Sequence, residues 1–229
     1  MAREQKEASR FKLGDSMSVI WKRSSHKVTE DFSAKVLRPQ FPDAFLRPRL
    51  FHRLDQAREL PLTWICGPPG AGKTTLVSSY VERAGTPCLW YQLDERDADP
   101  ATIFRYLRLA AEKSRLKRAG SLPQFLLEDV TYLKGFCRNF FEELFARLSA
   151  PFLLVLDNYQ ELPADSPVQK LLVLALESFP PGGNLFVLSR GAPTAAFASY
   201  RIRNPVALLE WNELRFTKTE TRTFLRRRG

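Results

Sequence analysis

The sequence predicts an α/β protein of three layers, in which helices cover both faces of a five-stranded, mostly parallel sheet. Two observations carry this prediction. Short apolar runs alternate almost throughout with stretches of helical periodicity, and this alternation is typical of repeated β-α-β units. In addition, residues 152–156 are apolar without interruption, as expected of a strand that is covered on both faces in a parallel sheet.

Five runs are expected to form the strands of this sheet. Each run is short and predominantly apolar, and the last is the weakest of the five. In chain order they are residues 62–66, 88–93, 152–156, 185–188 and 206–209.

Helices are expected between these strands. An acidic run at 94–99 ends the second strand and caps the next helix, in which apolar residues recur at i, i+3, i+4 and i+7. The following helix carries apolar side chains from Val130 to Leu148 on one side. In chain order the expected helices are a short one from Pro48, then 73–83, 103–111, 130–148, 168–179 and one from about residue 217.

The remaining segments are expected to be irregular. Residues 1–34 lack sustained periodicity and read as a flexible N-terminal extension, so the folded domain is 35–229. Proline-rich residues 35–48 favour an extended path into it, and the basic residues 113–124 form a loop. The terminal Arg-Arg-Arg-Gly suggests a truncation before further domains, with a short basic tail as the alternative.

The composition is that of a globular protein in a reducing compartment. Of the 229 residues 44% are hydrophobic and 17 are Phe, which is ample for a packed core. No apolar run reaches the roughly 18 residues that cross a bilayer, and no signal sequence is visible. The three cysteines show no paired spacing and the two histidines do not suggest a metal site. We therefore expect a cytoplasmic protein without membrane contact.

One stretch predicts chemistry. Residues 67–75 match the phosphate-binding pattern G-x-x-x-x-G-K-[ST] between a predicted strand and a predicted helix, which is the context that the pattern requires. Glycines allow successive backbone N–H groups to converge on a phosphate, and the helix N-terminus adds partial positive charge. The residues of this loop are Gly67, Pro68, Pro69, Gly70, Ala71, Gly72, Lys73, Thr74 and Thr75.

Two side chains of the loop have separate roles in this prediction. Lys73 is expected to contact the β- and γ-phosphates of ATP or ADP, and the Thr74 hydroxyl to ligate Mg²⁺. The alternative is a Gly/Pro-rich turn that matches by chance, but few chance matches also lie between a buried strand and a helix.

The formal net charge of +10 suggests a nucleic-acid partner. The basic residues are spread along the chain, however, and no module that reads DNA or RNA is visible. A basic surface together with a phosphate site explains the charge nearly as well, so nucleic-acid contact by this chain is not favoured.

Asp157 is the second anchor of the predicted site. It follows the apolar run 152–156, and the carboxyl ends of parallel strands form the mouth where ligands bind in open α/β folds. We expect its carboxylate to hold Mg²⁺ together with Thr74. A cap of a turn or helix is the alternative role.

The neighbouring residues bear on hydrolysis. Many ATPases carry a second acid directly after this aspartate, which orients or deprotonates the attacking water. Here that position is Asn158, whose amide can hold a water but cannot accept its proton. Glu161 lies three residues after Asn158 and is expected to fall outside the required geometry. We therefore expect slow hydrolysis or none.

Arg190 ends the predicted strand 185–188 together with Ser189. A cation at this edge of the sheet is placed to contact the γ-phosphate and to report its presence. Pairing with a surface acid is the alternative role.

Taken together, these residues resemble the N-terminal ATPase domain of the large ATP-dependent LuxR-type transcriptional regulators, within the signal-transduction ATPases with numerous domains (STAND). The resemblance covers residues 35–229. The phosphate loop is shared by many families, and the flanking R-P-R-L and L-R-F-T segments are more specific. The matching segments are R-P-R-L at 47–50, the loop at 67–75, W-Y-Q-L-D at 90–94, L-V-L-D-N-Y-Q at 154–160, L-S-R at 188–190 and L-R-F-T at 214–217.

The resemblance has implications for fold, partners and site. It implies a P-loop NTPase fold of the AAA-like strand order, in which the Ser189 strand separates the Asp157 strand from the strand before the loop. It implies that Arg47 and Arg49 lie beside the nucleotide base, although each could instead be a surface charge at the start of a helix. It also implies that ADP holds a closed monomer, whereas ATP with an inducer permits self-association.

Two departures from the family pattern stand at Asn158, where a second Asp is usual, and at Gln160, where a His is usual. They weaken the expectation of catalytic turnover. Full-length members also continue into a winged-helix module, helical sensor repeats and a DNA-binding domain, so we expect DNA contact only through domains outside this chain. The leading hypothesis is an ATP/ADP-binding switch module of a bacterial transcriptional regulator, and the alternative is an active P-loop ATPase unconnected with transcription.

Overall fold

The computed structural model describes residues 34–114 and 122–228 of the chain. From Val36 onward the chain forms one compact unit. The predicted flexible extension over residues 1–34 falls, except for Ala34, outside the described residues, and so does most of the predicted basic loop at 113–124.

The centre of the fold is a five-stranded, fully parallel sheet with the order β2-β3-β4-β1-β5. All five strands were expected, within one to two residues at each end, and β4 separates β3 from β1 as the resemblance implies. The strands are β1 (Leu62–Cys66), β2 (Cys88–Gln92), β3 (Phe152–Asp157), β4 (Gly183–Ser189) and β5 (Ala207–Leu209).

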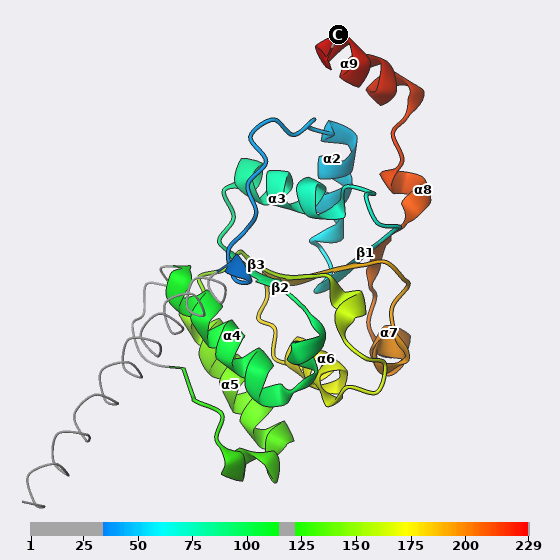
Figure 1. Cartoon of the computed structure of the whole chain (residues 1–229). Coiled ribbons are helices and arrows are strands. Elements are labelled where there is room, and N and C mark those ends of the chain that lie inside the picture. The colour runs from blue at the N-terminus through cyan, green and yellow to red at the C-terminus, as the bar shows by residue number, and fades with distance from the viewer. Residues whose placement is uncertain (1–33, 115–121, 229) are drawn as a thin grey trace, which may run out of the picture. The chain divides into compact units, whose positions relative to one another are not determined.

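Helices cover both faces of this sheet, which confirms the three-layer architecture. Figure 1 shows α2 and α3 on one face and α4, α5, α6 and α7 on the other. Two further helices, α8 and α9, follow β5. Their bounds are α2 (Pro48–Ala57), α3 (Lys73–Ala84), α4 (Pro100–Lys113), α5 (Leu133–Arg147), α6 (Pro167–Glu177), α7 (Ala198–Arg203), α8 (Trp211–Leu214) and α9 (Lys218–Arg228).

The helix starts follow from local chemistry. The Asp99 carboxylate accepts a hydrogen bond from the Ala101 N–H at the start of α4, and the Ser166 hydroxyl does the same for Val168 in α6. Such caps satisfy N–H groups that have no partner within the helix. Three helices also have proline in their first turn, where its missing N–H costs nothing.

The core has one apolar layer on each face of the sheet. On the α2–α3 side, Leu54, Val77 and Tyr80 pack with strand residues such as Ile65 and Phe186. On the opposite side the layer is largely aromatic. It includes Trp64 with Tyr159 and Phe197, and a cluster of Phe104, Phe136, Phe140, Phe141, Phe145, Phe152 and Phe179.

Three expectations about helices were wrong. Val130 was placed on the buried side of the fifth helix, but α5 begins at Leu133, and Val130 lies 57% exposed in a preceding 3₁₀ turn. No helix was expected between β4 and β5 or directly after β5, where α7 and α8 lie. These two helices have six and four residues, too few for a helical period to show in the sequence.

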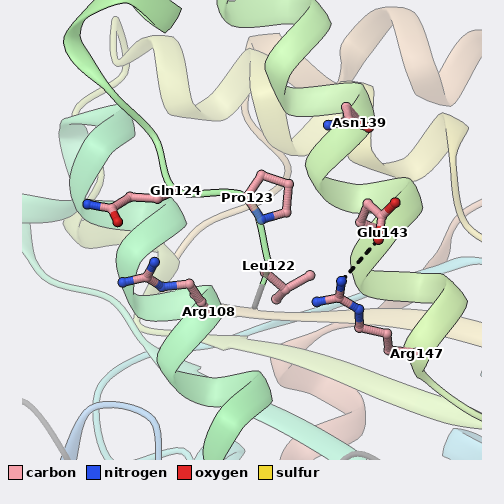
Figure 2. A pocket seen from close by; sticks show the side chains of 7 residues that line it. All are labelled: Arg108, Leu122, Pro123, Gln124, Asn139, Glu143 and Arg147. Atoms are coloured by element: carbon pink, nitrogen blue, oxygen red, sulfur yellow. Dashed lines mark hydrogen bonds and ion pairs between the residues drawn. The ribbon is translucent and has the colours of Figure 1, made fainter. Parts of the chain in front are cut away.

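A separate hollow of about 480 Å³ lies between α4 and α5 (Figure 2). The segment from Leu122 to Gln124 runs across it, and the Arg147–Glu143 ion pair of 3.1 Å borders it. Its lining contains none of the residues predicted to bind nucleotide. In the described part of the chain, none of the helices combines the length and apolar character needed to cross a bilayer.

Candidate nucleotide-binding site

The predicted phosphate loop runs from the end of β1 into the first turn of α3. Gly70 and Gly72 have φ angles of 74° and 77°, in the left-handed region that side chains other than glycine rarely adopt. Gly72 is the N-cap of α3 and Lys73 is its first residue. The free N–H groups of the α3 N-terminus and its partial positive charge are therefore directed into the loop, where an anion can bind.

Lys73 folds back over this loop. Its Nζ donates to the carbonyl oxygens of Gly67, at 2.6 Å, and Pro68, at 3.1 Å. Burial lowers the pKa of Lys73 below its ordinary value, Asp157 raises it, and Arg190 lowers it further. The structure thus brings together three charged side chains that the sequence predicted for one site from three separate segments.

Thr74 and Asp157 meet directly at the mouth of the sheet. The Thr74 hydroxyl lies 2.9 Å and 3.2 Å from the two carboxylate oxygens of Asp157, which is 3% exposed. Burial raises the pKa of the Asp157 carboxyl, while hydrogen bonds from the Thr74 hydroxyl and the Asn158 N–H and the charge of Lys73 oppose that shift. Hydroxyl and carboxylate oxygens are hard donors, so this pair fits Mg²⁺, which typically takes its other ligands from water and phosphate.

Asn158 follows Asp157 in an unusual backbone conformation. Its φ is 59°, the only positive φ of a non-glycine residue within the described ranges, and asparagine adopts this conformation more easily than most residues. Its N–H donates to the Asp157 carboxylate at 2.9 Å. The backbone of Asn158 thus supports Asp157, and its side chain offers an amide rather than a base.

Arg190 pairs with the acid that follows this turn. Its guanidinium lies 3.5 Å from the Glu161 carboxylate, and its backbone N–H donates to the Gln160 side-chain oxygen at 3.1 Å. Gln160 in turn donates to Glu161 at 3.1 Å. Arg190 therefore has the acidic partner that its alternative role requires, while its side chain remains 57% exposed at the mouth of the sheet.

Arg47 and Arg49 contact the segment after β5. Arg47 is 7% exposed, and its guanidinium donates to the Arg215 carbonyl oxygen at 2.9 Å. The alternative reading of Arg47 as a surface charge is therefore wrong. Arg49 is more exposed and donates to the Glu213 carbonyl oxygen at 3.0 Å. The two segments R-P-R-L and L-R-F-T, which are far apart in the sequence, thus lie in contact.

Sequence reasoning missed several residues around the loop. Leu214 of α8 packs so closely on Gly67 that a Cβ added to Gly67 would lie 3.2 Å from its Cδ1. Glu220, in the first turn of α9, binds Arg47 and Arg49. A helix was expected from about residue 217, and the T-x-x-E pattern at Thr217–Glu220 is a signal that could also have identified Glu220 as its capping acid. Leu214 belongs to the L-R-F-T segment, which carries no signal of a contact with the loop.

Comparisons with known proteins identify the family of this chain. Residues 46–188 match the model of the AAA ATPase domain family. The chain is 31% identical over 196 residues to the HTH-type transcriptional regulator MalT of Cronobacter sakazakii and 30% identical to MalT of Serratia proteamaculans. In each case 83% of this chain aligns with 21% of the relative, so the chain spans about a fifth of these regulators. The resemblance to the ATPase domain of large transcriptional regulators is confirmed, and the chain belongs to the AAA ATPase domain family.

Proposed function

We propose that this chain is the ATP/ADP-binding switch module of a bacterial signal-responsive transcriptional regulator, and that it binds Mg-ATP with slow hydrolysis or none. The observation that carries the proposal is the contact of Thr74 with the buried Asp157 beside a glycine-rich loop, with Asn158 in place of a second acid. The relatives named as transcriptional regulators support the regulatory role.

The proposal assigns the phosphates to the loop and to Lys73. Residues 67–75 supply backbone N–H groups, and the Lys73 ammonium exchanges its present carbonyl partners for phosphate oxygens. Thr74 and Asp157 hold Mg²⁺, which neutralises phosphate charge when it is bound. Arg47 and Arg49 border the site on the side where we propose that the nucleotide base lies, and neither is assigned a contact with the phosphates.

Weak turnover follows from the residues beside Asp157. Proton removal from the attacking water requires a base within hydrogen-bond reach, and an asparagine amide cannot accept a proton. Glu161 is the acid next in sequence, and it is paired with Arg190 and Gln160. In this proposal the binding of ATP or ADP, and not its hydrolysis, changes the state of the protein.

A switch also needs contacts that distinguish ATP from ADP, because a ligand shifts an equilibrium only through its differential affinity for the two states. Arg190 supplies this difference in our proposal, by exchanging Glu161 for the γ-phosphate. Self-association in the ATP state and a cytoplasmic location belong to the same proposal. DNA contact is assigned to parts of the regulator outside this chain.

The deciding experiment has two measurements on the purified protein. We expect nucleotide released by denaturation to be ADP in stoichiometric amount, and steady-state phosphate release from Mg-ATP to be far slower than one turnover per second. A rate near the ordinary enzymatic value of about 1–10 per second would overturn the switch and favour the active ATPase. An empty protein that fails to bind added Mg-ADP would overturn both.

A further inference from the structure

Three arginines of the α2 region hold the chain from β5 to the start of α9. Arg47 donates to the Arg215 carbonyl oxygen at 2.9 Å and Arg49 donates to the Glu213 carbonyl oxygen at 3.0 Å. Arg53 donates to the Leu208 carbonyl oxygen and to the Glu213 carboxylate, each at 3.2 Å. Because three of these four acceptors are backbone carbonyl oxygens, the contacts fix the path of the backbone from β5 toward α9.

Glu220 closes the same cluster from the first turn of α9. Its carboxylate lies 3.4 Å from the Arg47 guanidinium and 3.3 Å from that of Arg49, and it accepts the Thr217 N–H at 2.8 Å. Its side chain is 14% exposed. Charge-assisted hydrogen bonds in such a sheltered position are stronger than the same contacts on an open surface.

Aromatic rings complete this contact. The Arg47 guanidinium lies 4.5 Å from the centre of the Phe216 ring, within the range of a cation–π interaction. The Phe45 ring packs against Phe216 at 5.6 Å and against Phe224 of α9 at 5.7 Å. The start of α9 is therefore held by charge and by ring packing at the same place.

The held segment also forms one wall of the phosphate loop. Leu214 is 1% exposed and belongs to the same apolar cluster as Leu50 and Leu54 of α2. The position of a Cβ on Gly67 lies 3.2 Å from Leu214 and 3.6 Å from the Trp211 ring. A displacement of α8 would therefore change the packing at the first glycine of the loop.

We infer that Arg47 is a positioning residue for nucleotide binding, which fixes α8 against Gly67 and couples the phosphate loop to the start of α9. This inference rests on the proposed function. Arg47 acts through the 211–220 segment and not through contact with the nucleotide. Because coupling between two sites is reciprocal, bound nucleotide must also stabilise the 211–220 segment.

The test compares Arg47→Gln with Arg108→Gln. Arg108 is the control because it belongs to α4, which Figure 1 shows on the face of the sheet opposite to α2, and because it too forms an ion pair, with Glu112 at 4.0 Å. Hydrogen exchange of peptides covering residues 211–220 and the affinity for Mg-ADP are measured in both. For Arg47→Gln we expect exchange to be faster and the affinity to be weaker, each by at least about tenfold. One charge-assisted hydrogen bond is worth about that factor, and Arg47 bonds both Arg215 and Glu220. For Arg108→Gln we expect neither change.

Nucleotide provides the reciprocal measurement. In the unmodified protein, Mg-ADP should slow exchange in the 211–220 peptides. In Lys73→Ala, a variant impaired in nucleotide binding, these peptides should exchange as in the unmodified protein without nucleotide. Added Mg-ADP should not slow their exchange further. If Mg-ADP binds to the unmodified protein and leaves exchange in 211–220 unchanged, the coupling does not exist.

The other outcomes separate the explanations. Weaker affinity in Arg47→Gln without faster exchange means direct contact with the nucleotide, and faster exchange without weaker affinity means a purely structural contact; either result overturns the inference. If Arg47→Gln does not fold, Glu220→Gln decides by the same two measurements, because it removes the carboxylate charge and leaves the Arg215 contact in place. Failure of the unmodified protein to bind Mg-ADP overturns the proposed function instead.

Discussion

Asp157 and Asn158 are adjacent in the chain and differ in what they offer to the site. Asp157 offers a carboxylate, whereas Asn158 offers an amide. The Asp157 carboxylate is buried and held by the Thr74 hydroxyl and the Asn158 N–H, so its direction is fixed before any ligand arrives. Asn158 contributes its backbone to that arrangement, and its left-handed conformation aims its N–H at the carboxylate. In our proposal, the Asn158 side chain stands where an active ATPase would carry its catalytic acid.

Asn158→Asp tests whether this absence limits hydrolysis. Asp tolerates the left-handed conformation nearly as well as Asn, so we expect the fold to be kept. Steady-state phosphate release from Mg-ATP should rise by about 10²-fold, the lower end of what a positioned general base contributes. Asn139→Asp, at an exposed position on α5, is the control and should leave the rate unchanged. An equal rate in the unmodified protein and in Asn158→Asp would show that another step limits turnover.

Arg190→Ala tests the proposed distinction between ATP and ADP. Since Arg190 has its own partner in Glu161 at 3.5 Å, its removal should leave the affinity for Mg-ADP within about twofold of the unmodified protein, as for an exposed ion pair. Self-association in the presence of ATP, measured by light scattering, should be weaker in Arg190→Ala. Glu161→Gln removes the charged partner of Arg190 and should strengthen self-association in the presence of ATP. Equal loss of affinity for both nucleotides would contradict the role.

At the scale of elements, α8 and α9 show how short segments take their structure from distant partners. α8 has four residues, and its Leu214 is buried against the phosphate loop. α9 begins with reciprocal hydrogen bonds between Thr217 and Glu220, a local capping arrangement. The same Glu220 carboxylate binds Arg47 and Arg49. The local cap and the contacts with Arg47 and Arg49 thus stabilise the same start of α9.

The stability of this contact should depend on pH. Burial alone would raise the pKa of Glu220, but the Thr217 N–H and the guanidinium groups of Arg47 and Arg49 lower it from 4.5 to about 2. A carboxylate with a lowered pKa stabilises the folded state above its unfolded pKa, and this contribution is lost as the pH falls. The free energy of unfolding should therefore decrease between about pH 4.5 and pH 2, and less so in Glu220→Gln. Chemical denaturation at several pH values measures this, and parallel curves for the two proteins would refute it.

At the scale of the whole molecule, the sheet order brings the site together. β3 and β1 are neighbours of β4 on its two sides, so Asp157, Ser189 and the phosphate loop all lie at the carboxyl ends of adjacent strands. Crevices outside these ends are the usual ligand sites of open parallel sheets. α3 and the strands that flank the loop share one apolar cluster, so ligand binding at the loop should stabilise the domain as a unit.

Thermal unfolding measures this linkage. A ligand that binds only the folded state stabilises it by about 2.7 kcal/mol at a concentration of one hundred times its Kd. For a domain of this size we expect Mg-ADP to raise Tm by about 5–10 °C. Lys73→Ala should lose most of the shift, and Lys170→Ala, an exposed lysine on α6, should keep it. A shift of equal size in Lys73→Ala would place the nucleotide elsewhere.

Much of the fold was predictable because its signals are local. A buried strand or a long helix shows in a handful of consecutive residues, and all five strands and the longer helices were placed within a few residues of their observed ends. The position of helices and of buried residues was predicted wrongly where the sequence has no helical periodicity. The four residues of α8 are one case, and Val130, which is apolar but 57% exposed, is another. The strand order came from the family resemblance, since periodicity says nothing about which strands are neighbours.

The sequence alone determined the fold class and the chemistry of the phosphate loop, because both depend on residues that are adjacent in the chain. Only the tertiary structure decided how Asp157 reaches Thr74, at a separation of 83 residues, and that Arg47 reaches Arg215, at a separation of 168. The physical reason is that a charged side chain is stabilised by whichever partner the fold brings near it. The fold brings Arg47 to the start of α9, where it is buried against residues that no local pattern connects with it.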